Sequence, residues 1–157
     1  MFSMRLSHVP LRLATGAFIL NSGLGKRGVD TTHAEGLHGM AKGAYPYLAD
    51  LEPEQFAGLL SKGEITLGAA LLTPLVPSGV AGAGLALFSG LLLGMYLRTP
   101  ALHQEGSVAP SPQGVAIAKD VWMFGIGLAL VIDSLTPRRR RRRRRYNVRL
   151  RRGSSGG

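Results

Sequence analysis

Residues 113–145 read QGVAIAKDVWMFGIGLALVIDSLTPRRRRRRRR, an apolar segment of helix length followed almost at once by eight arginines. A helix of about 20 mainly apolar residues crosses a bilayer, so the segment that ends at Leu135 is long enough to span one. An arginine block is too costly to carry across and is retained in the cytoplasm, where positive residues gather. The junction therefore predicts a transmembrane helix whose C-terminal end faces the cytoplasm.

The positive charge of the chain is concentrated behind this helix. Eleven of the 19 basic residues lie between 138 and 152, which leaves 8 basic against 9 acidic residues elsewhere, although the whole chain carries +10. A nucleic-acid-binding domain more often spreads its charge over a folded surface. The distribution therefore argues against a nucleic-acid partner and favours a near-neutral body with a basic tail.

Three further apolar segments, at about 9–25, 56–76 and 79–97, precede the span at about 113–135. They hold many of the 22 glycines, which membrane helices tolerate because small residues let backbones approach closely. The sequence thus predicts an all-α fold, a polytopic four-helix transmembrane bundle over residues 1–136. Residues 137–157 are predicted to form a disordered, arginine-rich cytoplasmic tail.

The four predicted crossings place both termini in the cytoplasm and the loops 26–55 and 98–112 outside. In the first loop, apolar residues at helical spacing predict an amphipathic helix at about 33–48, which Pro46 should end or kink. The short connection at 76–79 predicts that the second and third spans form an antiparallel hairpin.

Two features of the spans suggest how they pack. Gly90 and Gly94 form a G-x-x-x-G pattern and are predicted to lie at a helix–helix contact. Arg12 lies one turn into the first span, and we expect its long side chain to reach the cytoplasmic headgroups.

Ionisable residues inside the predicted spans are the best candidates for a site. Charges at membrane depth cost roughly 2.5–3.5 kcal/mol on insertion scales and need partners. Glu64 and Lys119 lie at matched depth and are predicted to pair, while Asp120 is expected to partner Lys62 or Arg98. This polar cluster of Glu64, Lys119, Asp120 and Lys62 is either a structural ion-pair network or a pocket for a quinone headgroup or proton relay.

The basic tail allows three interpretations: a topology anchor, a clamp on anionic lipid headgroups, or a nucleic-acid contact. The adjacent membrane is the nearest polyanion, so the first two are favoured. The residues concerned are Arg138, Arg139, Arg140, Arg141, Arg142, Arg143, Arg144 and Arg145.

Three short motifs in these spans resemble the DoxX-like family of small four-helix bacterial membrane proteins. They are Arg12-Leu13-Ala14 leading to Gly23-Leu24-Gly25-Lys26, then Glu64 within Phe56–Gly68, and finally Ala118-Lys119-Asp120. The resemblance covers about 12–135 and implies a four-helix bundle in the bacterial inner (plasma) membrane. Members are associated with thiosulfate:quinone oxidoreduction or oxidative-stress complexes. The arginine tail and the long first loop depart from the family's pattern.

The functional prediction is an accessory or structural subunit of a membrane complex, with other membrane-protein subunits as partners and no cofactor. The alternative is a quinone-interacting subunit of a membrane oxidoreductase or oxidative-stress complex. The sequence favours no catalytic activity of its own, because it holds no phosphate-binding loop, zinc-protease motif or nucleophile elbow. It has no cysteine, and the histidines are not spaced as metal ligands. A solute carrier is disfavoured by the absence of inverted repeats.

Overall fold

The computed structural model describes residues 5–136, and in that range the chain is helical with no β-strand. The long helices occupy the four apolar segments of the sequence, and the prediction of an all-α fold is confirmed. The elements are α1 His8–Gly25, α2 Thr31–Ala44, η1 Pro46–Leu48, α3 Pro53–Leu72, α4 Ser78–Arg98, η2 Pro100–Leu102, α5 Val115–Ala118 and α6 Asp120–Leu135.

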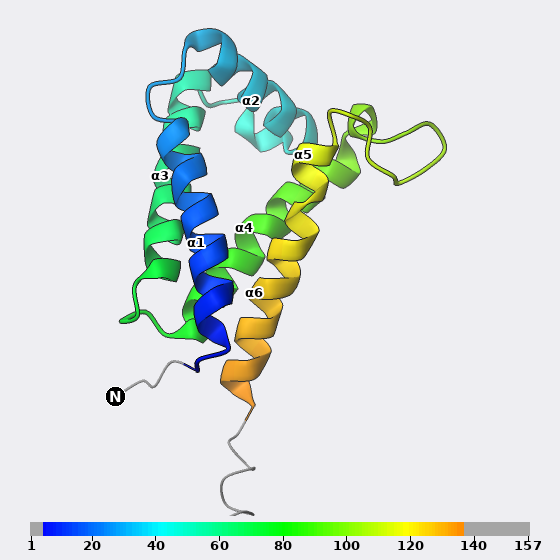
Figure 1. The fold of residues 1–157 in the computed structure, drawn as a ribbon. Coiled ribbons are helices and arrows are strands. Elements are labelled where there is room, and N and C mark those ends of the chain that lie inside the picture. Colours follow the sequence, from blue (N-terminus) through cyan, green and yellow to red (C-terminus); the bar gives the residue numbers. More distant parts are fainter. Residues whose placement is uncertain (1–4, 137–157) are drawn as a thin grey trace, which may run out of the picture.

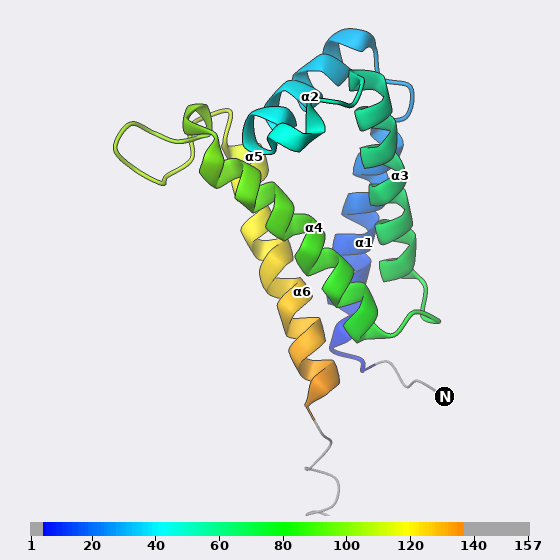
Figure 2. The same cartoon turned by 180° about the vertical axis from the view of Figure 1, so that it is seen from behind.

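The helices form two pairs that diverge like the arms of a V (Figure 1). Helix α1 packs along α3, and α4 packs along α6, whereas α1 and α6 barely touch. The view from behind shows α4 crossing α6 and leaning away from α3 (Figure 2). The predicted hairpin of the second and third spans is therefore wrong as a packing unit. Helices α3 and α4 follow each other in the chain, but each packs mainly on a helix distant in sequence.

Glycines set the closest approach of α4 and α6. A methyl group on Gly127 would lie 2.6 Å from the Ala86 nitrogen and 2.8 Å from the Gly82 carbonyl oxygen. Both distances are too short for real atoms, so only glycine permits this contact. Of the predicted G-x-x-x-G pair, Gly90 lies at the contact with α6, where a methyl group would be 3.3 Å from the Phe124 ring, whereas Gly94 faces the Tyr45 hydroxyl. The small-residue face of α4 that touches α6 thus runs from Gly79 through Gly82 and Ala86 to Gly90.

Helix α2 and η1 lie across the open end of the V (Figure 1). The Asp30 side chain caps α2 by accepting a hydrogen bond from the His33 backbone nitrogen at 2.8 Å. The helix stops before Pro46, as the sequence predicted, and η1 begins at that residue. The Tyr45 hydroxyl donates to the Leu91 carbonyl at 2.8 Å and so connects the C-terminal end of α2 to α4.

Two helical stretches, Ser78–Arg98 and Val115–Leu135, are long and apolar enough to cross a membrane. Helices α1 and α3 carry more polar residues and do not meet that criterion, although several of those residues point inward: Arg12, Thr15, Ser61 and Glu64 are all buried. Large apolar side chains face outward on all four long helices, among them Leu13, Leu24, Leu59, Leu87, Leu97, Val121, Trp122 and Ile132.

The expectation that the Arg12 side chain reaches the lipid headgroups is wrong. Arg12 is 2% exposed, and its guanidinium donates to the carbonyl oxygens of Ala70, Leu71, Thr73 and Val76 at 2.8–2.9 Å. These carbonyls belong to the end of α3 and the connection to α4. Carbonyls at a helix C-terminus lack partners within the helix and attract a positive charge, so Arg12 caps α3 from the neighbouring helix.

At the closed end of the V, the beginning of α1 meets the end of α6. Arg5 forms an ion pair with Asp133, and His8 Nε2 lies 2.6 Å from the other Asp133 oxygen. These contacts place the N-terminal end of α1 and the C-terminal end of α6 together (Figure 1). The arginine block and the predicted disordered tail at 137–157 lie outside the described residues.

Candidate functional site

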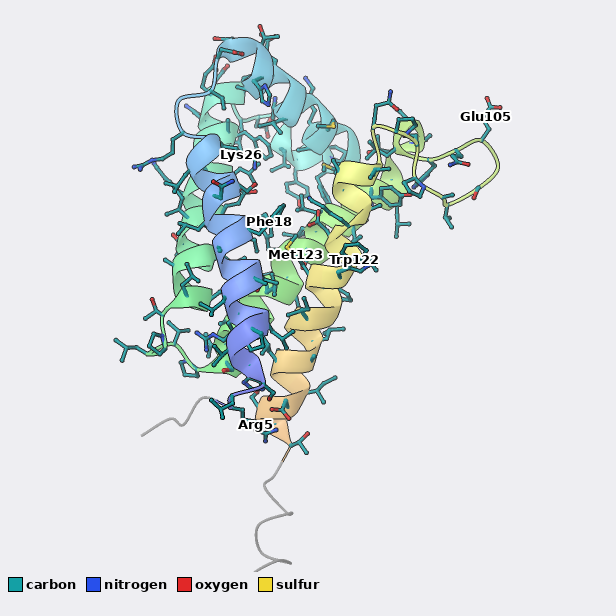
Figure 3. All side chains as sticks on the ribbon, in the orientation of Figure 1. Arg5, Phe18, Lys26, Glu105, Trp122 and Met123 are labelled. Carbon is teal, nitrogen blue, oxygen red and sulfur yellow. The ribbon has the colours of Figure 1, made fainter. Side chains whose placement is uncertain are left out.

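A cavity of about 510 Å³ lies between the two helix pairs, beneath α2. Its volume falls within the roughly 300–1,000 Å³ typical of small-molecule sites. Phe18 and Met123 point into the space between the pairs from α1 and α6 (Figure 3). Most of the wall is apolar, and the lining includes Phe18, Ser22, Lys26, Leu60, Glu64, Lys119 and Asp120.

On the wall formed by α1 and α3, Glu64 is paired with Lys26. The Lys26 ammonium donates to both carboxylate oxygens of Glu64, at 2.9 and 3.0 Å, and to the Ser22 hydroxyl at 2.7 Å. Ser22 and Lys26 are four residues apart and so share one face at the end of α1. Gly23 brings the helices close enough for this pair, since a methyl group there would lie 2.8 Å from Glu64 Cβ.

On the opposite wall, Lys119 and Asp120 occupy the junction of α5 and α6. The Lys119 ammonium donates to the Ala116 carbonyl at 2.6 Å and lies 5.0 Å from the centre of the Phe18 ring, across the gap to α1. Asp120 is 2% exposed, and its Oδ1 has no hydrogen-bond partner among residues 5–136. Burying a hydrogen-bond acceptor without a donor costs free energy, so Asp120 is a candidate to bind a donor from outside the chain.

Three of the four residues predicted to form a polar cluster therefore line one cavity: Glu64, Lys119 and Asp120. Lys62 lies on the exposed side of α3, because it is two residues from Glu64 and so points to another face of the helix. The expected pairs are not formed. Glu64 binds Lys26 instead of Lys119, and Arg98 lies over the Tyr45 ring and donates to the Ala44 carbonyl at 3.3 Å instead of reaching Asp120.

Sequence reasoning missed Lys26 and Ser22, because residue 26 falls at the start of the predicted outer loop 26–55. Matched depth alone cannot choose among the lysines near one end of a bundle; the choice depends on which helices are neighbours. Because α1 packs on α3, the lysine of α1 is the one within reach of Glu64. The spacing of Ser22 and Lys26 was the signal available in the sequence.

We expect Glu64→Gln and Lys26→Met each to destabilise the protein, and the double variant to recover part of the loss. Breaking a buried ion pair on one side typically costs about 3–5 kcal/mol, and Lys26, which is partly exposed, places the loss at the lower end. Thermal unfolding of the four proteins in one detergent gives the coupling free energy. The matched cycle of Glu64→Gln with Lys119→Met should be additive, and coupling there instead would contradict the observed pairing.

Within residues 5–136, no three His, Asp or Glu side chains gather closely enough to hold a metal ion. Such a cavity suits an apolar molecule that carries a polar head group, since the apolar walls face a few charged groups. No family model, curated protein or solved structure matches this chain.

Proposed function

We propose that this chain is an integral membrane protein that binds an amphipathic small molecule of the bilayer, of the quinone class, between its two helix pairs. The observation that carries the proposal is the apolar cavity with Glu64, Lys119 and Asp120 in its walls. A quinone-type molecule has the matching division into an apolar ring and tail and a polar head. The proposal therefore favours a quinone-interacting subunit over a purely structural one.

A membrane location is supported by two helical stretches that meet the length and hydropathy of spans. Helix α1 has 18 residues and α3 has 20, which corresponds to about 27 and 30 Å of helix. Both turn apolar side chains outward and bury one charged residue each, Arg12 in α1 and Glu64 in α3, while Glu54 and Lys62 of α3 are exposed. We propose that all four long helices cross the bacterial plasma membrane, and that the joined ends of α1 and α6 face the cytoplasm.

The buried charged residues of α1 and α3 are compatible with this location because they are compensated inside the protein, and the long side chain of the exposed Lys62 can extend toward the headgroups. Arg12 donates to backbone carbonyls, and Glu64 is paired with Lys26. Paired and hydrogen-bonded groups avoid most of the cost of an isolated charge in lipid. Membership of the DoxX-like family and partnership with other membrane subunits stay predictions from the sequence.

The first test is whether an apolar molecule co-purifies with the protein. Purified from membranes in mild detergent, the protein should retain a lipid-soluble, ring-containing compound that organic extraction and mass spectrometry detect. Leu60→Trp places an indole in the cavity and should reduce the retained compound at least several-fold, because the space is no longer free.

Leu59→Trp is the matched control, since the Leu59 side chain is 57% exposed on the outer side of the same helix. It should leave the retained compound unchanged. Equal retention by both variants, or no compound in the unaltered protein, would contradict binding in this cavity. Recovery of the folded protein in the soluble fraction without detergent would contradict the membrane location.

A further inference from the structure

We infer that the molecule bound in the cavity carries a hydroxyl head group that donates a hydrogen bond to Asp120. The site would therefore take a phenolic or quinol form in preference to the corresponding carbonyl, or quinone, form. This inference rests on the proposed function and adds the chemical form of the ligand and the residue that selects it.

Asp120 is the one cavity residue for which the described chain leaves a fully buried acceptor unpartnered. Its side chain lines the cavity, and Oδ1 is buried with no hydrogen-bond donor among residues 5–136. Water is the usual partner of such an acceptor, and a bound ligand at this wall of the cavity would replace it. A small rotation of the Asp120 carboxylate would bring this acceptor to a ligand hydroxyl in the cavity.

The neighbouring lysine does not supply this donor. The Lys119 ammonium is bonded to the Ala116 carbonyl and faces the Phe18 ring, so it lies toward α1. The Lys26 ammonium likewise donates to the Ser22 hydroxyl and to the Glu64 carboxylate. Lys26 and Lys119 thus both have partners, whereas Oδ1 of Asp120 has none within the described part of the chain.

The charges in the wall distinguish among possible donors. Lys26 and Lys119 balance Glu64 and Asp120, so the four groups sum to zero. An ammonium ligand would add an uncompensated charge to an apolar space, which is costly. A neutral hydroxyl adds none. A carbonyl head has no proton to donate, and its oxygen would face the acceptor-only carboxylate.

The test compares three small ring molecules that differ only at the head group: a short-chain hydroquinone, its dimethyl ether and its quinone. Binding to the protein, depleted of endogenous ligand in detergent, is measured by calorimetry without oxygen. The hydroquinone should bind at least about tenfold more tightly than the other two, as expected for a hydrogen bond to a charged group. Asp120→Leu should abolish that preference, whereas Asp50→Leu, at an exposed aspartate, should preserve it.

A stability measurement separates a ligand-binding role from a structural one. Because Asp120→Leu removes a buried acceptor without a partner, the ligand-free variant should unfold at the same temperature as the parent or higher. If Asp120→Leu does not fold, Asp120→Asn replaces it and should reduce the preference about fivefold or more, because a neutral acceptor forms a weaker bond.

The binding results distinguish failure of this inference from failure of the proposed function. The inference is overturned if the quinone binds as tightly as the hydroquinone, or if the Asp120→Leu variant retains the preference for the hydroquinone. Either result leaves the proposed cavity function intact. A protonated carboxyl that donates to a carbonyl would give the first result. Failure of all three ring molecules to bind overturns the proposed quinone-class function together with the inference.

Discussion

Arg12→Met is expected to destabilise the protein by about 3 kcal/mol or more. The guanidinium donates to four backbone carbonyls and to the Ser78 hydroxyl, so it connects α1, the end of α3 and the start of α4. Each hydrogen bond to a charged group is worth roughly 1.5–3 kcal/mol, and methionine would leave several of these carbonyls without partners. Thermal unfolding in a single detergent measures the change.

Two control variants test this explanation. Arg27→Met removes the same charge from an exposed position just after α1 and should change the unfolding temperature little. Arg12→Lys retains the charge but offers three donors where arginine offers five in a fixed planar arrangement, so it should recover only part of the stability. Full recovery by lysine would show that charge, and not the shared carbonyls, governs stability at this position.

Gly127→Leu is expected to separate α4 from α6 and to prevent the protein from folding in detergent. Even the methyl group of alanine would lie 2.6 Å from the Ala86 nitrogen and 2.8 Å from the Gly82 carbonyl oxygen. Both atoms belong to the backbone of α4, so no side-chain rotation relieves the overlap. Gly127→Ala should therefore lower the unfolding temperature clearly, and leucine should do so far more.

Gly125→Ala is the matched control two residues away on the same helix. A methyl group there meets no atom within 4 Å, and alanine favours a helix over glycine by up to about 1 kcal/mol. We expect this variant to be neutral or slightly stabilising. If both alanine variants had the same effect, the close approach of α4 and α6 would be contradicted.

Local patterns were sufficient to predict the elements of the fold. The four apolar segments became the four long helices, and Pro46 ended the helix of the first loop where its ring excludes a helical hydrogen bond. These properties depend on neighbouring residues along the chain. The same reasoning predicted that Glu64, Lys119 and Asp120 belong to one polar region, because it needs only their depth in each segment.

The partners of these residues could not be predicted in the same way. Depth in a span does not say which helix is adjacent, so the sequence paired Glu64 with Lys119, whereas the structure pairs it with Lys26. Arg12 was likewise expected to face lipid headgroups, although the end of α3 lies beside it and supplies unsatisfied carbonyls. Each of these errors concerned a contact between residues distant in the chain.

The sequence by itself determined that residues 5–136 are helical and where the helices lie. Tertiary structure alone decided that α1 packs on α3 and α4 on α6, and therefore that a cavity opens between the pairs with Asp120 in its wall. The reason is physical: helix formation follows from local periodicity, whereas helix pairing depends on close fits such as that of Gly127 against Gly82.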